Sequence, residues 1–346
     1  MKALFIGGTG TISSAITRLG VELGWEVFHL NRGNRKDDFK GVTQIQCDIR
    51  TEEEAVIRAK LEKTLGKDKY FDVVADFIAF VPDHVKKDFN IFNGLCRQFI
   101  FISTASAYQK PLSSCVVMES TPLANPYWRY SRDKIACEEY LLERYRESAF
   151  PITIVRPSHT YDERNVPLGV HGKKGSWQVL KRMTEGKPVI IHGDGTSLWT
   201  ITHNSDFACA FLRLMGNIHA IGEAVHITSD ESVTWNQIYR VIADTLNVEL
   251  KAVHIASDFL DECSGGIYDL KGSLTGDKAN SVIFDNTKLK RLVPGFSAKV
   301  RMDEGIRMTI RNILSNRELQ QEDAEFDEWC DKVIAAISAV KNTFRQ

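Results

Sequence analysis

The chain has 346 residues, and its 44 Lys and Arg residues almost balance its 45 Asp and Glu residues, which gives a formal net charge of −1. Because the basic residues are spread along the chain, the sequence lacks the positive stripe that binds nucleic acids or membrane surfaces, and we expect neither as a partner. The hydrophobic content of 43% and the charged content of 26% are ordinary for a globular protein. The length allows two domains, or one large α/β domain with an insertion.

The seven cysteines are scattered, odd in number and without any CxxC spacing. This pattern argues against a disulfide framework and against a zinc site, so we expect no bound metal. A strand is expected directly after Met1 in place of a signal peptide, and no apolar run reaches membrane-spanning length. We therefore expect a cytoplasmic protein whose cysteines are reduced.

The start of the chain combines an apolar strand with a glycine-rich turn. Residues 2–7 predict the strand, Gly7-Gly8-Thr9-Gly10 follows, a helix is expected over about 13–23, and a second strand over 25–30. In such a unit the backbone N–H groups of the turn approach a diphosphate at the positive end of the helix, which predicts a dinucleotide cofactor. The residues expected to hold it here are Gly7, Thr9, Gly10, Thr11 and Ile12.

The end of the second strand bears on the choice between NAD and NADP. Folds that bind NAD usually place a carboxylate there, against the ribose 2′-hydroxyl, whereas this chain has Asn31 and Arg32, with Arg35 and Lys36 close by. A guanidinium tolerates a 2′-phosphate, so an NAD(P) cofactor is expected with NADP mildly favoured over NAD. The alternative is that these residues form only a polar, solvated turn.

Short apolar runs continue to alternate with helical patterns. Strands are expected over 43–47, 71–80, 98–103 and 152–155. Helices are expected over 51–65, from the end of the strand over 71–80 to about 95, and over 130–148. Strands separated by helices indicate a parallel sheet covered on both faces, here a doubly wound α/β sheet of six or seven strands.

The pattern changes after Arg156-Pro157, where Pro, Gly and His residues mark a connection. We expect a cofactor-binding domain over 1–165, with returning segments near 196–230, and a mainly substrate-binding lobe over 166–346. The lobe mixes helices over 176–185, 205–215 and 234–246 with strands over 188–191, 223–228 and 249–255. A last helix, over 319–340, carries one apolar face that we expect to serve packing: Phe326, Trp329, Val333, Ile334 and Ile337.

Tyr130 and Lys134 are four residues apart on a predicted helix, so their side chains share one face. A tyrosine titrates near pH ~10, and an adjacent ammonium stabilises its phenolate and lowers that pKa. The pair is therefore a candidate acid–base couple. Taken alone, the same spacing also fits an ordinary half-exposed helix face.

Several motifs together resemble the extended short-chain dehydrogenase/reductase family, which includes the NAD-dependent sugar-nucleotide epimerases and dehydratases. They are Gly7-Gly8-Thr9-Gly10, Phe99-Ile100-Phe101-Ile102-Ser103-Thr104, Tyr130 to Lys134, Val155-Arg156-Pro157, Gly193-Asp194-Gly195 and His203 to Asp206. The resemblance covers nearly the whole chain. It implies a doubly wound parallel-sheet Rossmann fold with a smaller C-terminal substrate lobe.

The resemblance also implies a catalytic set of Thr104, Tyr130 and Lys134. Thr104 would bond the reacting sugar oxygen, Tyr130 would exchange its proton, and Lys134 would bind the nicotinamide ribose and depress the tyrosine pKa. Ser103 is the alternative to Thr104 if it does not point into the sheet, and Ser106 is a weaker substitute. Beyond the glycine turn and Asn31 and Arg32, the residues that we expect at the cofactor are Asp48, Ile49, Ala79, Tyr130, Lys134 and Pro157.

The chain departs from the family in three places. Ser13 stands at the third loop glycine, a mild change because serine is small. Ala105-Ser106 replaces the Asp-Glu pair of the dehydratases, which removes the acid and base of water loss.

The third departure concerns the substrate lobe. The epimerases hold a nucleotide diphosphate with an Asn and an Arg, and this chain has His159 and Trp199 at the corresponding positions. A tryptophan stacks on a sugar ring but does not pair with phosphate as a guanidinium does. We therefore expect Ser106, His159 and Trp199 to contact substrate, although Trp199 and His159 equally fit buried packing positions. If the substrate carries a diphosphate, the hypothesis is that Lys173, Lys174 or Lys181 replaces the missing Arg.

The expected function is that of an NAD(P)-dependent oxidoreductase or epimerase acting on a hydroxyl of a sugar or sugar nucleotide. A dehydrogenase or reductase of a non-nucleotide sugar or glycoside is an alternative, and so is a non-catalytic RNA-binding relative. The family often forms homodimers through the helix after the tyrosine, here residues 135–145. Leu141, Leu142 and Tyr145 in that helix equally fit a core-facing position.

Overall fold

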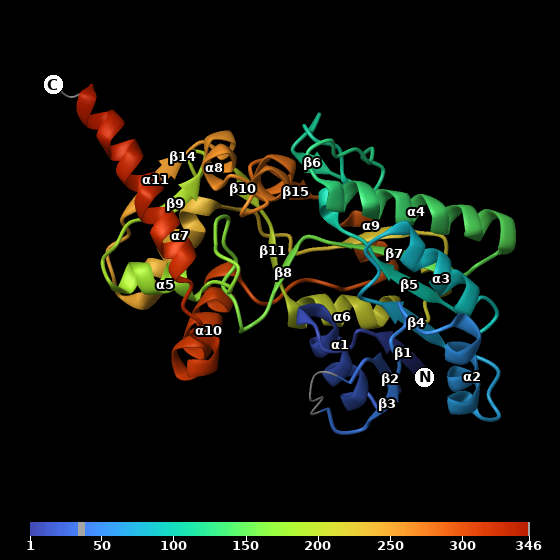
Figure 1. The fold of residues 1–346 in the computed structure, drawn as a ribbon. Coiled ribbons are helices and arrows are strands. Elements are labelled where there is room, and N and C mark those ends of the chain that lie inside the picture. The colour runs from blue at the N-terminus through green and yellow to red at the C-terminus, as the bar shows by residue number, and fades with distance from the viewer. Residues whose placement is uncertain (34–38, 345–346) are drawn as a thin grey trace.

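The computed structural model describes residues 1–33 and 39–344. Two lobes lie side by side, with the N-terminus in the sheet-containing lobe and the C-terminus at the far end of the last helix (Figure 1). The smaller lobe is built mostly from the C-terminal half of the chain.

A seven-stranded sheet forms the centre of the N-terminal lobe. Its strands run in the order β12-β7-β5-β4-β1-β2-β3, and every neighbouring pair is parallel. Their bounds are β1 Lys2–Ile6, β2 Glu26–Asn31, β3 Val42–Gln46, β4 Val73–Asp76, β5 Phe99–Ile102, β7 Ile152–Pro157 and β12 Ala224–Ile227. The predicted doubly wound sheet is confirmed. The chain order reverses between β1 and β4, which is where such folds bind their ligands.

Helices cover both faces of this sheet, because the residues of each strand alternate between two apolar cores. On β1, Leu4 and Ile6 join one core while Ala3 and Phe5 join the other. The first core includes side chains of α2 (Glu54–Leu65), α3 (Pro82–Phe92) and α4 (Arg129–Ser148). The second includes those of α1 (Thr11–Glu22), α6 (Asn204–Leu214) and α9 (Thr287–Leu292).

Segments from the second half of the chain thus return to the sheet. β12 forms one edge and α6 packs against α1, while α9 lies beside β12. In α4, Leu141 is fully buried, Leu142 packs partly against the core and Tyr145 is exposed.

The smaller lobe has its own core around the fully buried Trp235. Its helices are α5 Trp177–Thr184, α7 Trp235–Leu246, α8 Ser257–Ser264, α10 Met302–Ser315 and α11 Ala324–Thr343. Short strands connect them: β8 His159–Tyr161, β9 Val189–His192, β10 Leu198–Trp199, β11 Ile201–His203, β13 Val233–Thr234 and β14 Ala252–Ile255.

Three further elements border the two lobes. β6 (Val116–Val117) pairs with β15 (Ile283–Phe284), and a π-helix, η3, spans Lys271–Lys278. Short 3₁₀ turns lie at Ala105–Ala107, Ile218–Ala220 and Arg317–Leu319. No helix in the described part of the chain is both long and apolar enough to span a bilayer.

Two of the predicted elements extend beyond the observed ones. The strand expected over 71–80 ends at Asp76, because the Asp76 carboxylate accepts a hydrogen bond from the Ile78 N–H and turns the chain. The last helix begins at Ala324 instead of residue 319, since the Asp323 side chain caps it by accepting from the Phe326 N–H.

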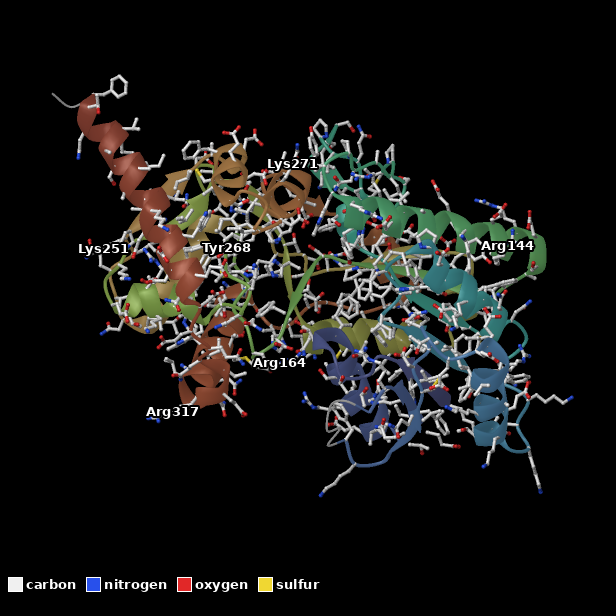
Figure 2. The ribbon with its side chains drawn as sticks, viewed as in Figure 1. Arg144, Arg164, Lys251, Tyr268, Lys271 and Arg317 are labelled. Atoms are coloured by element: carbon white, nitrogen blue, oxygen red, sulfur yellow. The ribbon has the colours of Figure 1, made fainter. Side chains whose placement is uncertain are left out.

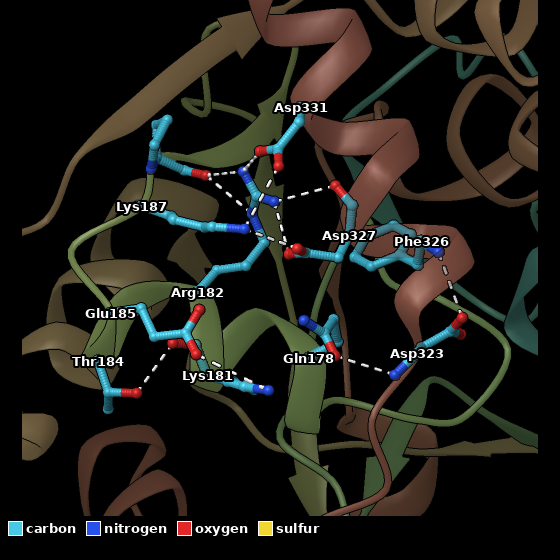
Figure 3. A network of polar contacts seen from close by, with 11 residues as sticks. Gln178, Lys181, Arg182, Thr184, Glu185, Lys187, Asp323, Phe326, Asp327 and Asp331 are labelled. Carbon is cyan, nitrogen blue, oxygen red and sulfur yellow. Dashed lines mark hydrogen bonds and ion pairs between the residues drawn. The ribbon is translucent and has the colours of Figure 1, made fainter.

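The C-terminal helix is held to the lobe by packing and by one buried cation. Phe326, Trp329 and Val333 are buried on its predicted apolar face. Arg182 of α5, 1% exposed, donates to the Asp327 carboxylate at 2.7 Å and to the Asp331 carboxylate at 2.7 Å. The same guanidinium donates to the Pro188 carbonyl, so it joins three segments of the lobe (Figure 3).

Candidate active site

The glycine-rich turn between β1 and α1 has the backbone shape that close approach to a ligand requires. Gly7 has a φ of +83°, and a Cβ there would stand 2.5 Å from Ile78 Cγ2. The helix begins at Thr11, so its first N–H groups have no partner within the helix and form a positive end beside the turn. This arrangement fits the diphosphate of a dinucleotide.

Ser13, at the family's third glycine, does more than allow close packing. Its hydroxyl donates to the Gly7 carbonyl at 2.8 Å and accepts from the Gly10 N–H at 2.8 Å. The side chain is almost fully buried. Ser13 therefore links the two ends of the turn by hydrogen bonds, a role that the sequence pattern alone did not reveal.

A cavity of about 690 Å³ opens from this turn along the carboxyl ends of β1, β2 and β4. Nine of the residues predicted to bind cofactor line it: Gly7, Thr9, Gly10, Thr11, Ile12, Asn31, Arg32, Asp48 and Ile49. Its position at the reversal between β1 and β4 and its size suit a dinucleotide. When bound there, NAD or NADP supplies a hydride acceptor or donor.

Other predicted cofactor residues lie elsewhere. Ala79 is not among the described residues lining this cavity; its carbonyl instead accepts from the Lys134 ammonium. Pro157 lines a second cavity, the candidate substrate cavity, which also contains Thr104 and Tyr130. Arg35 and Lys36 lie outside the described residues.

Beneath the cofactor cavity lies a buried ionic network that sequence reasoning missed. Arg50 lines the cavity and donates to Asp76 at 2.6 Å and to Asp88 at 2.9 Å. Both carboxylates are fully buried, and burial, reinforced by the charge of Asp76, raises the pKa of Asp88. Asp88 gave no signal because it reads as a polar position on an amphipathic helix.

A second cavity, of about 340 Å³, holds two members of the predicted catalytic set, Thr104 and Tyr130. The Thr104 hydroxyl lies 2.9 Å from the Ser106 hydroxyl, which in turn lies 2.7 Å from that of Ser131. Ser106 therefore lines the cavity while its hydroxyl is engaged with Thr104 and Ser131.

The alternative to Thr104 points away from this cavity. The Ser103 side chain is hydrogen-bonded to Glu138, which is buried and paired with Arg156 at 2.6 Å. Ser103 thus belongs to a structural network between α4 and β7, and Thr104 is the hydroxyl that faces the cavity of Tyr130.

Lys134 is buried, and the hydrogen bonds of its ammonium go to backbone carbonyls. Its ammonium donates to the Ala79 and Ile102 carbonyls at 2.6 Å each, and it lies 5.8 Å from the centroid of the Tyr130 ring. Burial lowers the pKa of Lys134 to about 8. Burial also raises the pKa of Tyr130 to about 12, against a smaller lowering by Thr104, which is opposite to the predicted direction. At neutral pH Tyr130 is therefore a phenol and a proton donor.

His159 and Trp199 form one unit in the wall of the substrate cavity. Trp199 Nε1 donates to His159 Nδ1 at 3.3 Å, and the Trp199 ring stacks on Trp235 with centroids 5.7 Å apart. Burial lowers the pKa of His159 to about 3, so the ring is neutral. Since Nδ1 accepts, the proton of His159 is on Nε2, where it can donate to a ligand.

A third cavity, of about 510 Å³, joins the other two at the junction of the lobes. It shares Thr11 with the cofactor cavity and His159 with the substrate cavity. Arg164 lies there (Figure 2) and donates to the Thr11 hydroxyl at 3.1 Å. Lys173 and Lys174 also line this cavity.

Lys181, the third lysine suggested for a diphosphate, is occupied by an ion pair with Glu322 at 2.6 Å. Sequence reasoning also missed three charged residues of the substrate cavity, Lys110, Asp277 and Lys278. They come from segments far apart in the chain and match no motif.

Comparison with known proteins agrees with this geometry. Residues 3–228 match the model of the NAD dependent epimerase/dehydratase family. A 2'-dehydrokanamycin reductase from Streptomyces kanamyceticus is 24% identical over 86% of this chain and 81% of its own length. The chloroplast stem-loop binding protein of 41 kDa b from Arabidopsis thaliana is 23% identical over 70% of this chain and 62% of its own length.

Among solved structures, the UDP-glucuronic acid 4-epimerase from Bacillus cereus, in complex with UDP-glucuronic acid and NAD, superposes with a TM-score of 0.70. The two share 20% identity, and the match covers 91% of this chain and 99% of that one. This likeness confirms the fold. Because the family match spans well over half of the chain and confirms the resemblance seen in the motifs, the chain is an enzyme of the NAD dependent epimerase/dehydratase family, with NAD as its class of cofactor.

Proposed function

We propose that this enzyme oxidises or reduces a hydroxyl-bearing carbon of a sugar or sugar nucleotide, using NAD(P) and the residues Thr104, Tyr130 and Lys134. The observation that carries the proposal is that residues at the end of β5 line both cavities. Ile102 lines the cofactor cavity, and Thr104, two residues later, lines the substrate cavity together with Tyr130. A sugar carbon beside Tyr130 would thus lie next to the cofactor.

In the direction of reduction, the Tyr130 phenol donates its proton to the carbonyl oxygen of the sugar, which becomes a hydroxyl group. Its raised pKa of about 12 keeps that proton available at neutral pH. Thr104 orients the same oxygen by hydrogen bonding, since its hydroxyl is fixed by Ser106. Lys134, held by two carbonyls, has one further N–H with which to bind the cofactor ribose.

Two replacements relative to the family's motifs indicate which of its reactions this enzyme catalyses. Ala105 and Ser106 supply no carboxylic acid beside Thr104, so water elimination lacks its acid and base. Trp199 stands where an Arg would pair with a nucleotide diphosphate, and it is engaged with His159. These features favour a non-nucleotide sugar or glycoside, and the reductase relative from Streptomyces kanamyceticus, named for a dehydrokanamycin, supports that class.

We propose NADP as the preferred form of the cofactor. Asn31 and Arg32 line the cofactor cavity at the end of β2, the position where an acidic residue would recognise the ribose of NAD. Comparing the KM of NAD with that of NADP, in the wild type and in Arg32→Asp, tests this preference. NADP is expected to have the lower KM in the wild type, and Arg32→Asp is expected to reverse the order.

The reaction itself is tested with a panel of free hexoses, uronic acids, glycosides and UDP-hexoses, each with NAD and NADP. Accumulation of reduced nicotinamide identifies a dehydrogenase, whereas an epimerised sugar without net cofactor change identifies an epimerase. If no sugar is converted in either direction with either cofactor, the proposed function fails.

The stem-loop binding relative keeps a second candidate, an RNA-binding protein, open to test. The convergence of Thr104 and Tyr130 in one cavity favours catalysis. Salt-dependent RNA binding that persists in Tyr130→Phe, together with an absence of turnover, would favour the second candidate. We also propose a cytoplasmic location and a homodimer that uses the exposed face of α4, which size-exclusion chromatography with light scattering would test.

A further inference from the structure

The substrate cavity contains a group of charged side chains that the proposed catalytic set does not use. Lys110, Asp277 and Lys278 all line the 340 Å³ cavity that holds Thr104 and Tyr130. Lys110 follows the strand of the catalytic threonine, while Asp277 and Lys278 end the π-helix η3. They reach the same cavity from two parts of the chain.

Lys110 is the most unusual member of this group. Its side chain is only 4% exposed, and among the residues that the structure describes its ammonium has no hydrogen bond or ion pair. Asp277 acts on it electrostatically but is not within ion-pair distance, and burial lowers the pKa of Lys110. Its nitrogen is not one of the fully buried, unpartnered atoms of the described residues, so it keeps access to the cavity, where a bound anion would pair with it.

Lys278 is similarly placed without a strong partner of its own. Among the described residues its ammonium reaches the Ser273 carbonyl alone, at 3.4 Å, whereas its own carbonyl accepts from Trp235 Nε1 at 3.1 Å and from His192. The backbone of Lys278 is therefore fixed to the core of the smaller lobe. Its side chain borders the cavity and is free to bind a ligand group.

The π-helix that carries Lys278 is tied to the catalytic helix. The buried Asn125 donates to the Ser106 carbonyl at 2.8 Å and to the Gly276 carbonyl at 2.7 Å, and Trp128 Nε1 donates to Asp269 at 2.7 Å. Asn125 and Trp128 directly precede α4. These bonds hold the charged group at a fixed place relative to Tyr130, which is what a substrate-recognition site needs.

The balance of charge indicates what such a site would bind. Two ammonium groups face one carboxylate in this cavity, and His159 adds a neutral N–H donor. The volume is at the low end of ligand pockets, which suits a single sugar ring. A net positive wall beside a sugar-sized space selects a sugar that carries a negative charge.

We propose that the substrate is a sugar with an acidic substituent, a carboxylate or a phosphoryl group, that Lys110 and Lys278 bind in the cavity of Tyr130. This inference rests on the proposed function, because it names the substrate class of the same site. Asp277 lines the same cavity, where its carboxylate disfavours a second negative charge on the substrate. An amino sugar, which Asp277 alone would attract, is the competing outcome.

The test is a calorimetric titration of D-glucuronate, D-glucose 6-phosphate, D-glucose and D-glucosamine into the enzyme saturated with NADP. At least one of the two acids is expected to bind about 10- to 100-fold more tightly than glucose, the range of a hydrogen bond to a charged group. Comparing the two acids distinguishes the carboxylate from the phosphoryl group. Equal or tighter binding of glucose or glucosamine, or no binding of either acid at millimolar concentration, would overturn the proposal.

Three variants and a control test whether the preference for acidic sugars comes from the side chains of this cavity. Lys110→Met and Lys278→Met are each expected to remove most of the preference for the acid, and Asp277→Asn is expected to strengthen acid binding by removing a repulsion. Lys271→Met, at the exposed start of the same helix (Figure 2), is expected to change nothing. Retained acid preference in both lysine variants would overturn the assignment, and a gain in Asp277→Asn cannot come from misfolding.

Binding and turnover are read separately in this design. Acid binding that persists in Tyr130→Phe while turnover is lost supports both proposals. Turnover of neutral sugars without acid preference leaves the proposed function intact and removes only this inference.

Discussion

Trp199 donates its indole N–H to Nδ1 of His159 across 3.3 Å, so the tryptophan sets which nitrogen of the imidazole carries the proton. His159, which lines the second cavity, therefore carries its proton on Nε2, and burial lowers its pKa to about 3. Under the proposed function, the pair would offer the substrate's hydroxyl groups a neutral donor in place of a charged partner for a diphosphate.

Trp199→Phe is expected to raise the KM for sugar about 2- to 10-fold, the value of one neutral hydrogen bond, with little change in kcat. The phenyl ring still packs on Trp235 but cannot fix His159. Steady-state kinetics at saturating cofactor measure the effect, and Trp177→Phe, outside the cavity in the same lobe, is the control. An unchanged KM in Trp199→Phe would assign Trp199 to packing alone.

Gly8→Ala is expected to lower cofactor affinity at least about tenfold and to destabilise the fold, since a clash in a packed site must be relieved by movement. A Cβ at Gly8 would overlap the imidazole of His29, which is held by the Thr17 hydroxyl at 2.9 Å. Cofactor titration and thermal unfolding give the two readouts.

The matched control is Gly20→Ala in α1, the helix after the turn, where a Cβ would meet its neighbours at 3.5 Å or more. That substitution is expected to leave cofactor binding unchanged and to stabilise the helix by up to about 1 kcal/mol. Equal cofactor affinity in the two variants would contradict the packing explanation.

Lys134 gives the stability of the protein a specific pH dependence. Its pKa is about 8 in the folded protein, against an ordinary value of 10.5, because burial penalises the charged form. Between these values the unfolded chain binds a proton that the native state does not, so stability rises with pH. Below pH 8 the buried ammonium is charged and destabilises the native state by its full amount. This destabilisation decreases as the pH approaches 10.5.

The free energy of unfolding of the wild type, relative to Lys134→Met, is therefore expected to increase by up to about 3 kcal/mol between about pH 8 and 10.5. Urea unfolding across that range measures it, with the exposed Lys271→Met as the control that shows no such trend. A flat difference between wild type and Lys134→Met would show that the ammonium is not desolvated in the fold.

Arg182→Met is expected to destabilise the smaller lobe by about 2 to 4 kcal/mol, because it leaves the Pro188 carbonyl and the Asp327 carboxylate without their buried partner. Asp331 is half exposed, which limits the loss. Lys187→Met removes a partly exposed cation from the same carboxylates (Figure 3) and is expected to cost less than about 1 kcal/mol. Equal unfolding midpoints for the two variants would contradict the assigned role of Arg182.

The sheet and the cofactor turn could be predicted from the sequence because their signals are local. Buried parallel strands such as Phe99–Ile102 are unbroken apolar runs, and the glycines of the turn stand directly between strand and helix. The two-residue strands β10 and β13 could not be predicted, since they exist only through their pairing across the smaller lobe.

The candidate site was predictable where it follows the family motifs and not where tertiary contacts build it. Thr104 and Tyr130, which the motifs single out, line one cavity, and their catalytic role stays a prediction. Lys110 and Asp277 line the same cavity although they are far apart in the chain, and Asn125 holds the π-helix to residues 105–107 by two hydrogen bonds that no spacing encodes. The pKa of Tyr130 is raised and not lowered, because burial, which the sequence does not show, outweighs the lowering by Thr104.

The central claim is that Tyr130 exchanges a proton with a carbohydrate beside a nicotinamide cofactor. Its most direct test is the rate of reduced-nicotinamide formation or consumption by Tyr130→Phe, with the best sugar of the panel and with cofactor affinity measured in parallel. The account predicts a loss of at least about 100-fold in turnover with unchanged cofactor affinity. Turnover within a few-fold of the wild type in Tyr130→Phe would contradict it.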